Sequence, residues 1–69
     1  MGSAFPQTTA QKAYELSFAY IHSSKRLAFP CDEKGVVHLE LLSERARNNY
    51  FYARAMLGRE FLVPQVQLV

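Results

Sequence analysis

The chain has a single cysteine, so no disulfide can form within its 69 residues. A chain this short buries only about 60% of the surface that its unfolded form exposes, which makes a lone core marginal. Small domains are therefore usually stabilised by disulfides, a bound metal or oligomerisation. With the first excluded, the sequence predicts a well-packed monomer, a metal-bound domain or an oligomer.

Metal and catalytic motifs are missing as well. Cys31, His22 and His38 are the only cysteine and histidines, and their spacing matches no paired zinc motif such as Cys-x-x-Cys. Asp32 follows Cys31, and acidic neighbours disfavour the thiolate that a nucleophilic cysteine needs. No glycine cluster could cradle a phosphate. We expect a non-enzymatic protein with no metal and no cofactor.

No apolar run approaches the roughly 18 residues of a membrane-spanning helix. The N-terminus also lacks the basic start and apolar core of a secretory signal. Together with the single unpaired cysteine, these absences predict a cytoplasmic protein with no membrane partner. Apolar residues make up 49% of the chain, so we expect a folded domain spanning residues 1–69.

The first predicted element is an amphipathic helix over about residues 9–24, after an irregular arm at 1–7. Thr8 is a good N-cap, and Gln11 completes a capping box with it. At 100° per residue, small and apolar side chains share one arc of this helix. The residues of that arc are Ala10, Ala13, Tyr14, Ser17, Ile21 and Ser24.

A strand is predicted over residues 36–41, where Val37, Leu39 and Leu41 alternate with polar or outward positions. The polar turn at 31–35 would let this strand form a hairpin with residues 27–30. In the competing interpretation, the turn is a linker and residues 39–42 begin the second helix.

The second helix is predicted over residues 43–57, with Ser43 as N-cap and Gly58 as the stop. Helical spacing places its core stripe at Ala46, Tyr50, Ala53 and Leu57.

The far side of this helix carries more aromatic surface than a two-layer domain needs. The predicted protein interface there consists of Phe51, Tyr52, Ala55 and Arg59. A second copy of the chain would cover it most simply. Alternatively, the C-terminal segment 61–69 covers Phe51 within one monomer.

The sequence predicts a terminal extended segment over residues 61–69. Pro64 confines this segment to a sheet edge or an irregular start. Pairing with residues 36–41 would make the second helix a parallel crossover. Pairing with a neighbouring copy is equally open. The predicted fold is α+β, with two amphipathic helices on a sheet of two or three strands. The alternative is an all-α helical pair with extended arms.

The arginines supply an alternative function. Arg47 and Arg54 share one side of the second helix, next to aromatic residues that could stack on bases. Arg45 and Arg59 point elsewhere, and Glu44 lowers the local charge, which disperses any basic patch. The sequence therefore favours a small, self-associating protein-interaction module. A nucleic-acid-binding regulator that uses the four arginines is the alternative.

Overall fold

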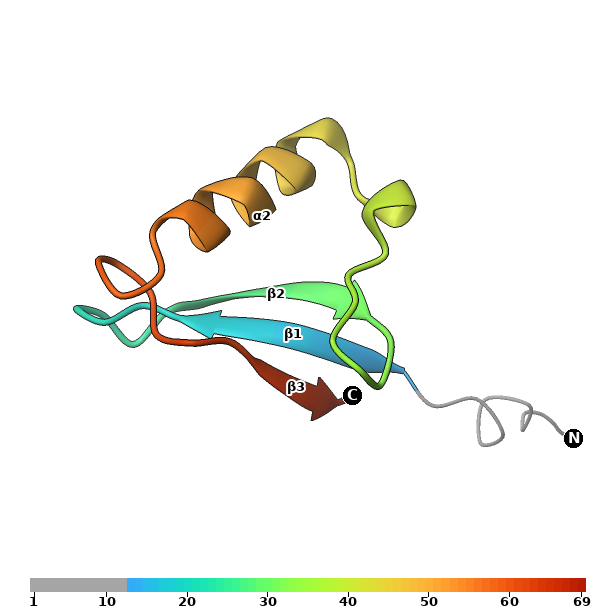
Figure 1. The fold of residues 1–69 in the computed structure, drawn as a ribbon, viewed down its shortest axis with the longest axis horizontal. Coiled ribbons are helices and arrows are strands. Elements are labelled where there is room, and N and C mark those ends of the chain that lie inside the picture. The colour runs from blue at the N-terminus through green and yellow to red at the C-terminus, as the bar shows by residue number, and fades with distance from the viewer. Residues whose placement is uncertain (1–12) are drawn as a thin grey trace, which may run out of the picture.

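A computed structural model describes residues 13–69, which form a three-stranded antiparallel sheet with one α-helix over one face (Figure 1). The strands follow the spatial order β2-β1-β3. In chain order, the elements are strand β1 (Tyr14–Ala19), strand β2 (Arg26–Cys31), a 3-10 turn (Leu39–Leu41), helix α2 (Glu44–Ala55) and strand β3 (Gln65–Leu68). The predicted α+β class is confirmed, whereas the all-α alternative is wrong.

The predicted first helix is wrong over residues 14–24, and its first residues, 9–12, lie outside the described part of the chain. Large apolar side chains in this stretch recur at every second position, which matches the period of a strand. Leu16 and Phe18 are buried on the face toward α2, while Glu15 lies on the opposite face. A helix would have spread these side chains around its axis.

β1 and β2 form a hairpin in which Leu16 lies opposite Phe29 and Phe18 lies opposite Leu27. Pro30 is tolerated in β2 because the backbone groups of this residue point away from β1, so no hydrogen bond between the two strands needs an N–H there. Its carbonyl oxygen accepts a hydrogen bond from the His38 N–H at 2.9 Å. The outer edge of β2 is therefore partly covered by its own chain.

The predicted strand over residues 36–41 is wrong. Val37 makes one antiparallel bridge with Cys31, after which the chain coils into the 3-10 turn. The predicted hairpin persists only as this bridge, because the chain coils into the 3-10 turn and does not continue along the outer edge of β2. The turn before the bridge depends on Asp32, whose carboxylate accepts hydrogen bonds from the Lys34 and Val36 N–H groups at 2.8 and 2.9 Å.

The helix α2 begins where the sequence predicts. The Ser43 hydroxyl accepts a hydrogen bond from the Ala46 N–H at 3.1 Å, which caps the first turn. The helix ends at Ala55, two residues before the predicted end. Gly58, at φ +81°, serves the tight reversal that follows, where its N–H donates to the Phe61 carbonyl at 2.7 Å.

The C-terminal strand is confirmed, but its partner is β1, with Leu16 opposite Val66. This pairing is antiparallel, so no parallel crossover exists. The register shifts along the segment: Phe61 lies opposite Tyr20, and Gln65 lies opposite Ser17. The C-terminal segment thus advances four residues, from Phe61 to Gln65, while β1 advances only three, from Tyr20 to Ser17. The extra residue forms a one-residue β-bulge between Leu62 and Gln65.

The core is an aromatic cluster around Phe18, which is fully buried. Its ring makes edge-to-face contacts with Phe29, Tyr50 and Phe61, at centroid separations of 5.8, 6.2 and 6.2 Å. Such contacts each add about 0.5–1.5 kcal/mol beyond the area that they bury. Ala53, also fully buried, belongs to the same core. The predicted inner stripe is confirmed at Ala53 and Tyr50, whereas Leu57 packs against the core from beyond the end of α2 and Ala46 is not part of the core cluster.

Phe18→Ala is expected to unfold most of the population. Truncation of a large core aromatic costs about 3–5 kcal/mol, and a domain of this size rarely has much more to lose. Urea titration followed by far-ultraviolet circular dichroism measures the loss. Phe51→Ala is the matched control, because that ring is half exposed and should cost much less. Equal losses in the two variants would contradict the central role of Phe18.

Asp32→Ala is expected to destabilise the fold at neutral pH and to have less effect in acid. The hydrogen bond from the Val36 N–H, helped by that from Lys34, lowers the pKa of the Asp32 carboxyl below 3.8. The ionised carboxylate therefore stabilises the fold above pH 3.8, and this contribution disappears as pH falls through the lower folded pKa. Urea titrations of the wild-type and Asp32→Ala proteins across this pH range measure whether their free energies of unfolding approach each other as the pH falls. A difference in stability that does not change with pH would contradict it.

Candidate protein interface

The helix surface, defined by Phe51, Tyr52, Ala55 and Arg59, is exposed at all four positions. Tyr52 is nevertheless held by its own chain. Its hydroxyl donates to Glu60 Oε2 at 2.6 Å, and this hydrogen bond raises the pKa of the Tyr52 phenol. Its ring also lies edge-on to Phe61, with a centroid separation of 6.0 Å.

Phe51 has less intramolecular support. Its ring contacts the Tyr50 ring at a centroid separation of 5.5 Å, yet the residue remains 51% exposed. The C-terminal segment was the alternative cover predicted for Phe51. It reaches Tyr52 through Phe61, while half of Phe51 stays open to solvent. The helix surface thus offers one free aromatic ring beside one that is already engaged.

The arginines predicted for nucleic-acid contact do not form one free patch. The Arg47 Nη2 donates to the Leu42 carbonyl oxygen at 3.4 Å. The Arg54 guanidinium lies over the Tyr50 ring, 6.0 Å from its centroid. Arg45 and Arg59 are exposed. Two of the four predicted contacts are therefore engaged with the chain itself.

Cys31 and His38 are the potentially reactive side chains near the turn at residues 31–35. Cys31 is 4% exposed, and burial raises the pKa of its thiol, with further contributions from Asp32 and Glu15. His38 Nδ1 lies 3.8 Å from Glu40 Oε2. Within residues 13–69, no group of three histidine, cysteine, aspartate or glutamate side chains is placed to hold a metal ion. In the same residues, no helix is long and apolar enough to cross a membrane.

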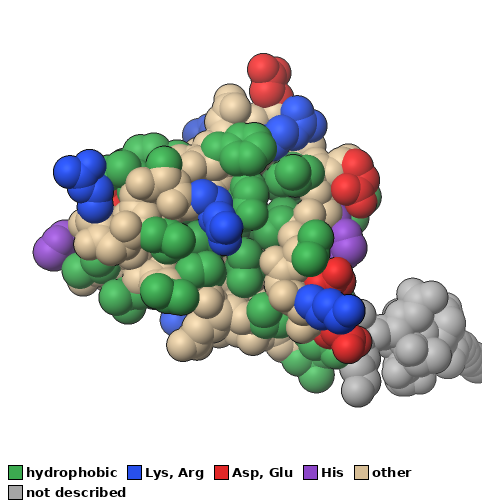
Figure 2. All heavy atoms as spheres, in the orientation of Figure 1, with side chains coloured by type: hydrophobic (Ala, Val, Ile, Leu, Met, Phe, Trp, Pro, Cys, Tyr) green, Lys and Arg blue, Asp and Glu red, His purple; other side chains and the backbone are tan. Residues whose placement is uncertain are grey.

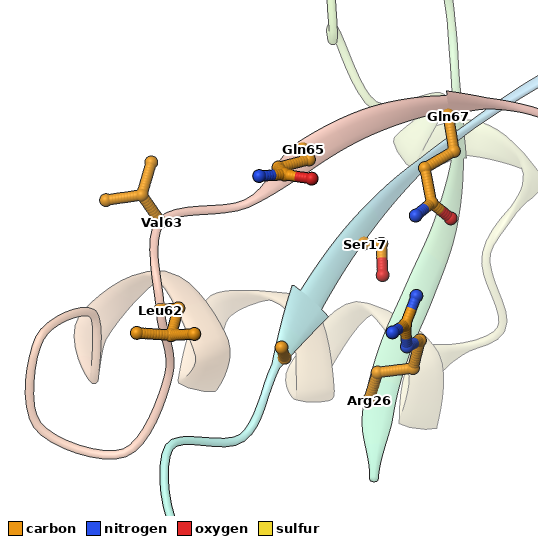
Figure 3. A pocket seen from close by; sticks show the side chains of 7 residues that line it. Ser17, Arg26, Leu62, Val63, Gln65 and Gln67 are labelled. Atoms are coloured by element: carbon orange, nitrogen blue, oxygen red, sulfur yellow. The ribbon is translucent and has the colours of Figure 1, made fainter. Parts of the chain in front are cut away.

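A shallow hollow of about 160 Å³ lies on the face of the sheet opposite α2 (Figure 3). Ser17, only 6% exposed, projects into it from β1, and Arg26 and Gln67 approach from the two flanking strands. Hydroxyl, guanidinium and amide groups could together hydrogen-bond a polar group of another molecule. The complete lining is Ser17, Ala19, Arg26, Leu62, Val63, Gln65 and Gln67.

The C-terminal segment carries the largest set of exposed apolar side chains. Val63 is 78% exposed and Leu68 is 62% exposed. Figure 2 shows hydrophobic side chains reaching the surface at several places on the face that it draws. The other members of the exposed set in this segment are Leu62, Val66 and Val69.

The predicted interface residues do not include these side chains, although the sequence leaves pairing of residues 61–69 with a neighbouring copy open. A further signal of an exposed edge is present in this segment. No charged residue occurs from Phe61 to Val69. Natural edge strands usually carry lysine, another charge or proline, which discourage pairing with other chains. Pro64 lies within the bulge, and β3 itself has none of these devices. The free edge of β3 is therefore the least protected part of the described sheet.

No protein-family model matches the chain, and neither a curated protein nor a solved structure is significantly similar to it.

The Cys31 thiol is expected to react slowly with iodoacetamide in the folded protein and rapidly in concentrated urea. Burial limits access of the reagent, and the raised pKa reduces the thiolate fraction at neutral pH. Mass spectrometry of time points measures both rates on the same chain. Equal rates in the two conditions would contradict a buried Cys31.

Proposed function

We propose that the chain is a small, non-enzymatic protein-interaction module that associates with a second copy of itself. The observation that carries this proposal is the combination of exposed apolar side chains and absent charge along residues 61–69. Edges of this kind readily pair with other chains. An exposed apolar surface also gains free energy when a partner covers it, by about 25 cal/mol per Å² removed from water.

The size of the chain supports the same proposal. Within residues 13–69, few side chains are fully buried, and the largest of them are Phe18 and Phe61. A core of that size gives a marginal domain, for which association is a common source of further stability. Association also adds stability by mass action, because only the folded chain presents the interface.

The helix surface at Phe51 remains a second predicted interface. Figure 1 places α2 over one face of the sheet and β3 at the edge of that sheet, so the two surfaces can be tested separately. We assign self-association to the C-terminal segment, because its apolar residues outnumber the single free ring of Phe51. Binding through Phe51 would then involve a different surface and can coexist with a dimer.

The nucleic-acid alternative stays a prediction that no specific observation favours. Arg47 and Arg54 already contact Leu42 and Tyr50, which reduces the number of free cations on α2. Binding to random DNA or RNA that weakens steeply with added salt would support this alternative.

The apparent mass in sedimentation velocity is expected to rise from that of the 7.9 kDa chain toward twice that value. This rise should occur as the concentration increases through the micromolar range. Leu68→Lys should shift the transition to higher concentration, because it places a charge on the free edge of β3. Phe51→Ala should change the transition little.

A strictly monomeric wild-type chain would overturn the proposed self-association. Weakening by Phe51→Ala with no effect of Leu68→Lys would instead assign the interface to the helix surface. Circular dichroism of each variant checks that the monomer still folds, so that loss of association is not confused with loss of structure.

A further inference from the structure

We propose that the β3 strands of two copies pair edge to edge, antiparallel, about a two-fold axis that passes beside Gln67. This inference rests on the proposed self-association and specifies its geometry. The result is a continuous six-stranded sheet with the order β2-β1-β3-β3-β1-β2.

The free backbone groups of β3 belong to Val66 and Leu68. Beyond the end of β3, the Val69 N–H donates to the Ala13 carbonyl oxygen at 2.8 Å, so Val69 points its backbone groups toward β1. Backbone groups alternate in direction along an antiparallel strand. Gln65 and Gln67 therefore also point toward β1, while Val66 and Leu68 point toward solvent.

Antiparallel pairing about Gln67 satisfies all of these free groups. Val66 then lies opposite Leu68 of the second copy, and the symmetric pair repeats the contact. Each pair exchanges two N–H to carbonyl hydrogen bonds, as in an ordinary hydrogen-bonded pair of antiparallel strands. Gln67 of one copy lies opposite Gln67 of the other, and these two residues form the non-hydrogen-bonded pair between the two Val66–Leu68 pairs.

A register centred on Val66 is worse because of Pro64. It would place Leu68 opposite Pro64 of the second copy, and proline has no N–H to donate to the Leu68 carbonyl. One hydrogen bond would be lost at each end of the interface. The register centred on Gln67 avoids this position.

Side-chain chemistry favours a second copy as the occupant of this edge. In the proposed register, valine meets leucine on the face toward α2, and glutamine meets glutamine on the opposite face. Val66 and Leu68 are 41% and 62% exposed in the single chain, so their contact would remove apolar surface from water. No charged residue lies on β3, so self-pairing brings no like charges directly opposite one another.

The opposite edge of the sheet is partly covered, which favours pairing at β3. Pro30 lacks a donor, and its carbonyl already accepts from His38. The Val37 bridge to Cys31 covers the same end of β2. Because each β3 pairs with the same strand of the second copy about a two-fold axis, the contact is closed and does not propagate through β3.

Cysteine substitution tests the register. Across the axis, the two Cα atoms at position 67 would lie about 4.5 Å apart, within the range of about 4.4–6.8 Å for disulfides. The two positions 65 would be offset by four residues, or roughly 13 Å along the strand. Gln67→Cys should therefore form an intermolecular disulfide under mild oxidation, and Gln65→Cys should not.

The two variants are closely matched. Gln65 and Gln67 are both exposed, lie on the same face of the same strand and line the same hollow. Native Cys31 remains in place, and the unsubstituted chain measures any cross-link that it forms. Non-reducing electrophoresis and intact-mass measurement quantify the disulfide dimer in all three proteins.

Val66→Pro supplies an independent readout. It removes an N–H that points to solvent within one copy, so it should preserve the fold. Because it deletes donors on both sides of the proposed axis, dimerisation should weaken about tenfold or more. Sedimentation measures the association, and circular dichroism confirms the folded monomer. Unchanged dimerisation by a folded Val66→Pro would overturn edge pairing.

The remaining outcomes separate this inference from the proposed function. Equal cross-linking at positions 65 and 67 would indicate random collisions and overturn the register. No cross-link at position 67 in a chain that still dimerises would overturn edge pairing and leave self-association intact. A strictly monomeric wild-type chain would overturn both.

Discussion

The contacts of Phe18 hold together parts of the chain that are distant in sequence. Its ring meets Phe29 from β2, Tyr50 from α2 and Phe61 from the reversal after α2. No disulfide performs this task, because the chain has one cysteine. The sheet, its helical cover and the return of the C-terminal segment thus depend on the same buried ring. Placing the segment beside β1 also creates the free edge on which the proposed function relies.

Local signals in the sequence predicted those parts of the fold that local chemistry controls. Ser43 caps α2 as expected, and Ala53 and Tyr50 lie on its inner side. The signals around β1 conflicted, because its small residues recur at helical spacing while Leu16 and Phe18 alternate as in a strand. Strand pairing decided the outcome, and pairing depends on segments that are distant in sequence. The strand predicted over residues 36–41 is wrong because residues 39–41 form the 3-10 turn and do not pair with β2.

The candidate interface could be predicted only in part. Helical spacing correctly placed Phe51 away from the core, because the side of a helix that a residue occupies follows from its own sequence. The edge at Val66 and Leu68 could not be found in this way. Whether a strand lies at the centre or the edge of a sheet depends on the order in which all strands pair. Pro64 indicates an edge position for residues 61–69, and the absence of charge in this segment indicates that the edge is unprotected.

The bulge between Leu62 and Gln65 decides which way the end of the chain faces. Phe61 before it and Val66 after it both lie on the side of the sheet toward α2, although five steps would ordinarily place them on opposite sides. If the segment kept all its residues but paired with β1 without the bulge, Gln65 would lie opposite Leu16 and the glutamines would turn toward the apolar side. The backbone groups of Val66 would then turn toward β1. A single inserted residue thus allows one short segment both to close the core and to present its apolar side chains beside a free edge.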